Sequence, residues 1–179
     1  LGLDEIHMYD VYMPLASEVQ RTYTFEEAKQ IVQKGLKPLG ERYGAVLKQG
    51  MESRWIGIYE NEGKRTGAYS WGAYGTHPYV LLNFNGNLTN VFTLAHEMGH
   101  ALHSYFSDEA QPYVYAGYKI FVAEVASTCN EALLIHYLME QSKDEKERMY
   151  LINYFLDKFK GTMFRQTMFA EFEKMTHAA

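Results

Sequence analysis

The feature that most constrains this 179-residue chain is the pentapeptide His-Glu-Met-Gly-His at residues 96–100. A helix is expected around it, because Thr89 or Asn90 can cap a helical pattern that runs to about Phe106. On an α-helix, two residues four positions apart lie about 40° apart on one face and one turn apart along the axis. Both imidazoles can then bind one Zn²⁺, while Glu97 can reach a water beside the metal.

The motif competes with a simpler interpretation, in which two histidines lie on a helix surface without a metal. Chance produces the pattern in about 0.03 of chains of this composition. Gly99 argues for the metal site, because a glycine inside a helix costs about 1 kcal/mol relative to alanine. A glycine at such a position often marks close packing or function.

A catalytic zinc site needs a third protein ligand and an open position. The metzincin pattern requires Gly at position 103 and His at position 106, where this chain has His103 and Phe106. In a gluzincin the third ligand is instead a glutamate from a second helix. Residues 120–141 show the pattern of such a helix, with an apolar composition interrupted by one polar face.

That polar face contains Glu124, Ser127, Thr128 and Glu131, at spacings that place them together on a helix. A buried carboxylate is costly unless it is paired or bound to a metal. Glu124 is therefore expected to be the third ligand. Glu131 is expected to accept an N–H from a liganding histidine, with a solvated carboxylate as the alternative.

The rest of the chain predicts a mainly α fold with a small β-sheet (α+β), in one domain over residues 1–179. A capping box at Thr24 and Glu27 predicts a helix that ends at Gly35. Other helices are expected at 39–49 (bounded by Gly50), 89–106, 120–141 and 143–174, the last interrupted near Gly161 and burying an apolar face. Strands are expected at 55–59, 66–71 and 79–84.

Composition excludes several classes of protein. The 17 Lys and Arg against 22 Asp and Glu give a net charge of −5, which argues against a nucleic-acid partner. No run of 18 apolar residues is present, so no membrane span is expected. The single Cys129 excludes an internal disulfide and fits a reducing compartment. The start at Leu1 and an end within a helical pattern suggest truncation at both ends.

The segments 93–103 and 121–131 resemble the thimet oligopeptidase and oligoendopeptidase F family of zinc metallopeptidases, with the closer likeness to oligoendopeptidase F. Segments 3–14, 63–69 and 160–172 extend this resemblance over nearly the whole chain. It implies a zincin-like helical catalytic core, in which one helix carries H-E-x-x-H and a second carries the glutamate.

The resemblance implies one Zn²⁺ per chain, bound by His96, His100 and Glu124, with Glu97 as the general base. It also implies cleavage of short peptides in a deep helical channel, a cytoplasmic location, and a peptide backbone that pairs with the strand at 79–84. Family members are longer, with an N-terminal helical portion and a downstream Tyr- and His-containing segment. We therefore expect further chain on both sides of this one.

Several other residues are weaker candidates. His103 is expected in the cleft or beside a ligand rather than as a fourth ligand, which would close the site. Contact with substrate is the hypothesis, and packing the alternative, for His77, Tyr74, Tyr113, Tyr115 and Tyr118. Cys129 is expected to point away from the metal face.

Two other interpretations of the whole chain remain open. The chain could be a non-catalytic helical module whose metal is structural or absent. It could also be an inactive fragment of a peptidase, and exposed apolar surface could then drive it to form oligomers.

Overall fold

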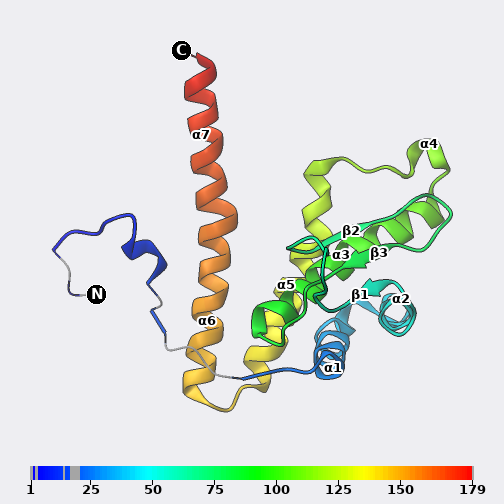
Figure 1. Cartoon of the computed structure of the whole chain (residues 1–179), viewed down its shortest axis with the longest axis horizontal. Helices are drawn as coiled ribbons and strands as arrows, with labels where there is room; N and C mark the ends of the chain where they lie inside the picture. The colour runs from blue at the N-terminus through cyan, green and yellow to red at the C-terminus, as the bar shows by residue number, and fades with distance from the viewer. Residues whose placement is uncertain (1, 3, 14, 17–20, 179) are drawn as a thin grey trace. The chain divides into compact units, whose positions relative to one another are not determined.

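The computed structural model describes residues 2, 4–13, 15–16 and 21–178 (Figure 1). Residues 3 and 14, which belong to the resembling N-terminal segment, lie outside the described residues, as do residues 1, 17–20 and 179. The chain forms two compact units. The core unit is Arg21–Glu140, and the terminal unit combines residues 1–20 with residues 141–179. The expectation of one domain stays a prediction.

The core unit begins with helix α1 (Phe25–Gly35), as the capping box predicted. The Thr24 hydroxyl accepts a hydrogen bond from the Glu27 backbone N–H at 3.2 Å, and the Glu27 carboxylate accepts one from the Thr24 backbone at 2.8 Å. The buried face of α1 includes Phe25, Ala28 and Val32. A short 3₁₀ helix, η2 (Lys37–Leu39), leads on to the next helix.

Helix α2 (Glu41–Glu52) continues past Gly50, so the prediction that this glycine ends the helix was wrong. The reason is tertiary packing. A Cβ on Gly50 would lie 2.6 Å from the Trp55 ring and 2.8 Å from the Met98 side chain. The glycine therefore makes room for neighbouring side chains rather than breaking the helix.

The sheet contains β1 (Ile56–Gly57), β2 (Tyr69–Trp71) and β3 (Tyr79–Leu81), in the order β1-β3-β2. Strand β1 is parallel to β3, and β2 is antiparallel to it. All three strands are shorter than predicted, although the pairing continues beyond β3: the Leu82 N–H donates to the Gly57 carbonyl at the end of β1, and the Phe84 N–H donates to the Ile58 carbonyl just after it. Because β3 is paired on both sides, the expectation that it pairs with a peptide was wrong. Strands β1 and β2 form the two edges of the sheet, and β2 is the edge strand closer to β3 in the sequence.

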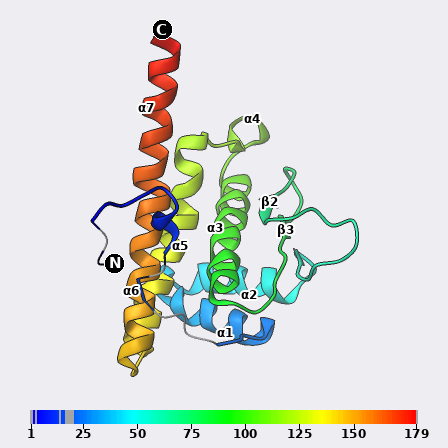
Figure 2. The same ribbon diagram turned by 60° about the vertical axis from the view of Figure 1, so that its left-hand side comes forward.

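Helix α3 (Leu88–Ala110) lies between the strands and helix α5 (Ile120–Gln141), as Figure 2 shows. Its N-cap is Asn87 rather than Thr89 or Asn90, because the Asn87 side chain accepts the Asn90 backbone N–H at 2.8 Å. Several apolar residues of α3 are fully buried, among them Val91, Leu94 and Ala101. The short helix α4 (Tyr113–Ala116) occupies the loop between α3 and α5.

The terminal unit contains α6 (Glu145–Phe159), a π-helical segment (Lys160–Phe164) and α7 (Arg165–Ala178), which run on as one rod in Figure 1. The predicted interruption near Gly161 is confirmed as this π-helical segment. A 3₁₀ helix, η1 (Asp10–Tyr12), belongs to the same unit, and Lys160 donates a hydrogen bond to the Val11 carbonyl at 2.8 Å.

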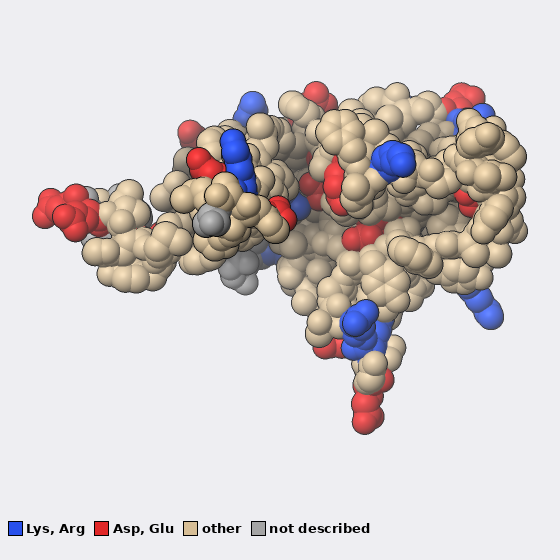
Figure 3. Space-filling model, turned by 90° about the horizontal axis from the view of Figure 1, so that it is seen from above, with Lys and Arg blue, Asp and Glu red and all other residues tan. Residues whose placement is uncertain are grey.

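The prediction that the last helical region buries its apolar face was wrong. Of α6 only Leu151 is buried, and no described residue of α7 is. The periodic side chains of this region are between 42% and 60% exposed: Met149, Ile152, Leu156, Phe159, Met163 and Phe169. Among the described residues, no helix is both long and apolar enough to cross a membrane. On the face in Figure 3, Lys and Arg side chains are scattered among Asp, Glu and uncharged side chains.

Candidate active site

The site forms where α3 and α5 come into direct backbone contact. A Cβ on Gly99 would lie 2.7 Å from the Ser127 Cα and 3.0 Å from the Ala126 carbonyl oxygen. Those atoms are backbone, so only a glycine permits this separation of the two helices. The close packing that the sequence suggested for Gly99 is what brings the two predicted ligand helices together.

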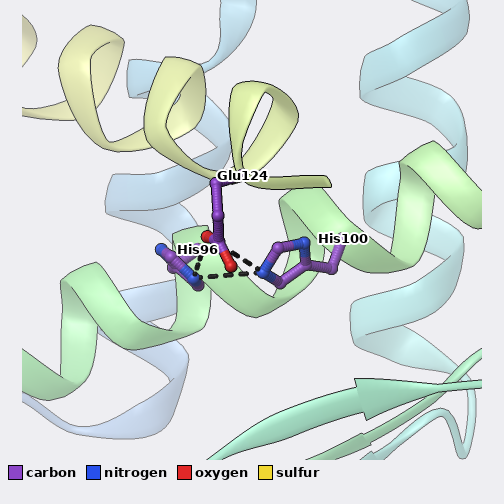
Figure 4. Close-up of side chains that lie close together, drawn as sticks. All are labelled: His96, His100 and Glu124. Atoms are coloured by element: carbon purple, nitrogen blue, oxygen red, sulfur yellow. Dashed lines mark hydrogen bonds and ion pairs between the residues drawn. The ribbon is translucent and has the colours of Figure 1, made fainter. Parts of the chain in front are cut away.

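Three predicted ligands converge at this contact, as Figure 4 shows. The Nε2 atoms of His96 and His100 are 3.1 Å apart. Glu124 Oε2 lies 3.3 Å from His96 Nε2 and 3.5 Å from His100 Nε2. In a tetrahedral zinc site with bonds of about 2.0–2.1 Å, neighbouring ligand atoms are about 3.3 Å apart. The three side chains therefore have the spacing and the chemistry of a zinc-binding group.

Glu131 fixes the orientation of the first histidine. Its Oε1 atom lies 3.0 Å from His96 Nδ1, so the ring donates Nδ1–H and presents the Nε2 lone pair toward His100 and Glu124. Burial alone lowers the pKa of His96, but the hydrogen bond to Glu131 and the surrounding carboxylates outweigh it, so this pKa is raised overall. Burial lowers the pKa of His100, which favours the neutral, ligating form.

Glu97 is a buried carboxylate next in sequence to His96, one of the three predicted ligands, and 7% of its surface is exposed. Burial raises the pKa of this carboxyl, the nearby His96 opposes the shift, and the Glu124 and Glu131 charges add to it. A carboxylate held in this way is a stronger base than one in water. Its environment suits a group that accepts and returns a proton.

Ser127 supports the Glu124 carboxylate. Its hydroxyl lies 2.9 Å from Glu124 Oε2 and 3.0 Å from the Glu124 carbonyl oxygen, one turn earlier on the same helix. The hydroxyl is fully buried. The sequence placed Ser127 on the polar face of α5, but it gave the side chain no role.

The sequence analysis missed a buried polar connection between three helices. Tyr43 of α2 donates a hydrogen bond to Asn130 Oδ1 at 2.9 Å, and Asn130 Nδ2 donates one to the Ala95 carbonyl at 2.9 Å. Burial raises the pKa of Tyr43 to about 12, so its hydroxyl stays a donor at physiological pH. Asn130 precedes Glu131 and Ala95 precedes His96, so this pair aligns the helices beside the site. An asparagine within an apolar helix was the signal available in the sequence.

The weaker candidates lie farther along α3 and beside the sheet. His103 stacks on Tyr118 with ring centroids 3.8 Å apart, and it is outside the three-residue ligand group. His77 stacks on Trp55 and contacts Tyr79. Tyr115 is 74% exposed, and the structure gives it no role. Cys129 is exposed.

Replacing Gly99 by alanine is expected to weaken both the fold and the metal site. The added Cβ overlaps the α5 backbone, and overpacking costs about 1–3 kcal/mol. Because the overlapped atoms are backbone and cannot move aside cheaply, we expect this cost to exceed the gain of about 1 kcal/mol from alanine's helix propensity. The midpoint of thermal unfolding and the zinc affinity should both fall.

Gly44→Ala is the matched control, since Gly44 lies in α2 with no atom near the position of a Cβ. This variant should be as stable as the parent protein or more stable by up to about 1 kcal/mol. Equal zinc affinity and stability in the Gly99→Ala and Gly44→Ala proteins would show that the close helix contact is not needed.

Comparison with known proteins gives one consistent family. The family model described as peptidase family M3 matches residues 1–179. The chain is 58% identical over 177 residues to oligopeptidase PepF of Bacillus subtilis, which covers 99% of this chain and 26% of that protein. It is 49% identical over 179 residues to group B oligopeptidase PepB of Streptococcus agalactiae, covering 100% of this chain and 30% of that protein.

Solved structures agree with the sequence relatives. A crystal structure of a Chlamydophila abortus protein described as a peptidase superposes with a TM-score of 0.87 at 47% identity, covering 99% of this chain and 30% of that one. Oligoendopeptidase-F of Enterococcus faecium matches with a TM-score of 0.60 at 36% identity, covering 98% and 23%. The chain thus spans less than a third of the length of these relatives. The mainly α fold with a small sheet is confirmed, and the chain belongs to peptidase family M3.

Proposed function

We propose that the complete gene product containing this chain is a zinc-dependent endopeptidase that hydrolyses short peptides. His96, His100 and Glu124 are the proposed ligands of one Zn²⁺, and Glu97 is the proposed general base. The observation that carries the proposal is the spacing of the three ligand atoms, 3.1 to 3.5 Å, beside a buried carboxylate.

The ligand number favours a catalytic site over a structural one. Structural zinc sites are closed by four protein ligands, whereas catalytic sites use three and keep one position open. In the part of the chain that the structure describes, the ligand group comprises two histidines and one glutamate, and His103 is not among them. The three residues therefore fit the catalytic arrangement.

Zinc bound here supplies a Lewis acid, which lowers the pKa of water toward ~7 and polarises a carbonyl group. The chain's own residues perform the proton transfers. The Glu97 carboxylate accepts a proton from the attacking water, holds it on a carboxyl oxygen, and donates it to the nitrogen of the departing amine. Glu131 keeps the His96 ring in the ligating orientation throughout.

Strand β2 is the proposed place for the peptide backbone. It is an edge strand of the sheet, and an extended peptide can add to such an edge through main-chain hydrogen bonds. Its residues Tyr69 and Trp71 are exposed, so an added peptide would lie between aromatic side chains. The cytoplasmic location stays a prediction.

Metal removal tests the proposal directly. Elemental analysis of the purified complete gene product should give one zinc per chain, and a chelator should abolish hydrolysis of a quenched fluorescent peptide. Adding one equivalent of Zn²⁺ should restore the rate. A protein that takes up no zinc, or that cleaves the peptide equally well after its zinc is removed, would contradict the proposal.

A further inference from the structure

A cavity lies along α3, beyond the two histidines proposed as ligands. Its volume is about 530 Å³, which is within the range of small-ligand sites. Three segments of the core unit line it: the connection from β2 to β3, the second half of α3, and the α4 loop. Its side chains include Tyr74, Ser104, Asp108, Tyr113 and Tyr118.

Hydrogen bonds within the protein hold the cavity walls in place. The Tyr74 hydroxyl donates to the Gln111 carbonyl at 3.0 Å, which ties the strand connection to the loop after α3. The Tyr118 hydroxyl and Ser104 Oγ are 2.8 Å apart. The rings of Tyr74 and Tyr113 meet edge to face at 5.6 Å. The cavity is therefore assembled from aromatic rings whose positions are constrained from several elements.

Asp108 carries the only charge among the described residues that line the cavity. It is half-buried, and no hydrogen bond or ion pair from another described residue reaches its carboxylate. The adjacent Glu109 differs, because it lies outside the lining and pairs with Arg42 at 2.6 Å. An unpaired anion beside tyrosine rings favours a cation, which gains both an ion pair and contact with the ring faces.

The cavity begins close to the proposed reaction centre. Ser104 lies one turn after His100 on α3, and Asp108 lies two turns after it, which is about 12 Å along the helix axis. An extended peptide advances about 3.3 Å per residue. Asp108 is therefore at the distance of a residue about three or four positions from the bond to be cleaved.

We propose that this cavity is a subsite for a cationic group of the peptide, an ammonium or a guanidinium, bound by Asp108 among Tyr74, Tyr113 and Tyr118. This subsite rests on the proposed function, since it assigns a specificity to the same peptide cleft. The cation can come from a lysine or arginine side chain or from the peptide's amino terminus. Both sources present the same kind of cationic group to Asp108, and the experiment below distinguishes them.

Peptide binding is measured by fluorescence anisotropy on the complete gene product carrying Glu97→Gln, so that no probe is consumed. In one series of labelled peptides the amino terminus is acetylated and a single lysine is placed at each position in turn. Each of these peptides is compared with one that has norleucine at the same position. A second series compares free with acetylated amino termini. In at least one arm the cation should tighten binding about tenfold, the scale of one partly desolvated ion pair with an aromatic contact.

Asp108→Asn should reduce that ratio to about one. Asp108→Lys should reverse it, so that a glutamate peptide binds more tightly than its norleucine twin. Glu109→Gln is the matched control and should keep the full preference, since Glu109 lies outside the cavity lining. Circular dichroism confirms that each variant is folded.

Tighter binding in the lysine series would identify a side chain as the source of the cation, and tighter binding of free amino termini would identify the peptide's end. Either result supports the subsite. Equal affinity of charged and neutral peptides in both arms would overturn it, as would a preference that Asp108→Asn leaves intact. Because the readout is binding, it remains decisive even if the zinc experiment shows that the protein does not hydrolyse peptides.

Discussion

Glu97→Gln in the complete gene product is expected to lower kcat for peptide hydrolysis by about 10²–10⁴-fold, the usual contribution of a general acid–base group. The amide has nearly the same shape as the carboxylate, but it cannot accept the proton of the attacking water. Glu97 is not in the ligand group, so zinc should remain at one per chain. The measurement is kcat and KM on a quenched peptide, together with elemental analysis.

Glu109→Gln provides the control for the loss of one carboxylate on α3. Glu109 lies on the same helix but pairs with the exposed Arg42, away from the ligands. Its variant should keep nearly the parent rate. Hydrolysis by the zinc-loaded Glu97→Gln protein at close to the parent rate would show that another group accepts the proton.

Glu124→Gln is expected to have the second large effect, a loss of zinc affinity beyond the 10–100-fold that is typical of groups behind the ligands. The neutral amide is a much weaker ligand for zinc than a carboxylate. Because the Glu124 side chain is 60% exposed, its replacement should leave the fold intact. Competition with a chromogenic zinc chelator measures the affinity, and thermal unfolding of the metal-free protein checks the fold.

Glu131→Gln sets the scale for this comparison. The glutamine can still accept the hydrogen bond from His96, but it removes the negative charge behind the ring. We expect a loss of about 10–100-fold in zinc affinity, smaller than for Glu124→Gln. If the two variants lost the same affinity, the assignment of Glu124 to the metal and Glu131 to the histidine would be wrong.

The two helices that carry the candidate ligands could be predicted because the features that define them involve residues close together in the sequence. The spacing of His96 and His100 decides that both rings share one helix face, whatever the rest of the chain does. The bounds of α5 match the expected range, and the capping box at Thr24 is formed by residues three apart. Such features depend on backbone geometry over one or two turns, which a sequence pattern records directly.

Features that depend on packing between distant segments were missed or misjudged. Gly50 resembles a helix stop, yet it lies inside α2 against Trp55. The strand at 79–84 has the composition of an edge or a central strand, and only its pairing on both sides shows that it is central. The link from Tyr43 through Asn130 to Ala95 joins residues far apart in the chain. No local pattern contains these contacts.

The sequence by itself determined which residues are candidate ligands, their helix faces and the separation of the two helices along the chain. Only the tertiary structure decided that the helices approach closely enough at Gly99 for Glu124 to meet both imidazoles, and that Asp108 faces an aromatic cavity. The physical reason is that the two kinds of feature depend on interactions over different distances along the chain. Helix periodicity acts over a few residues, whereas the distance between two helices depends on every side chain packed between them.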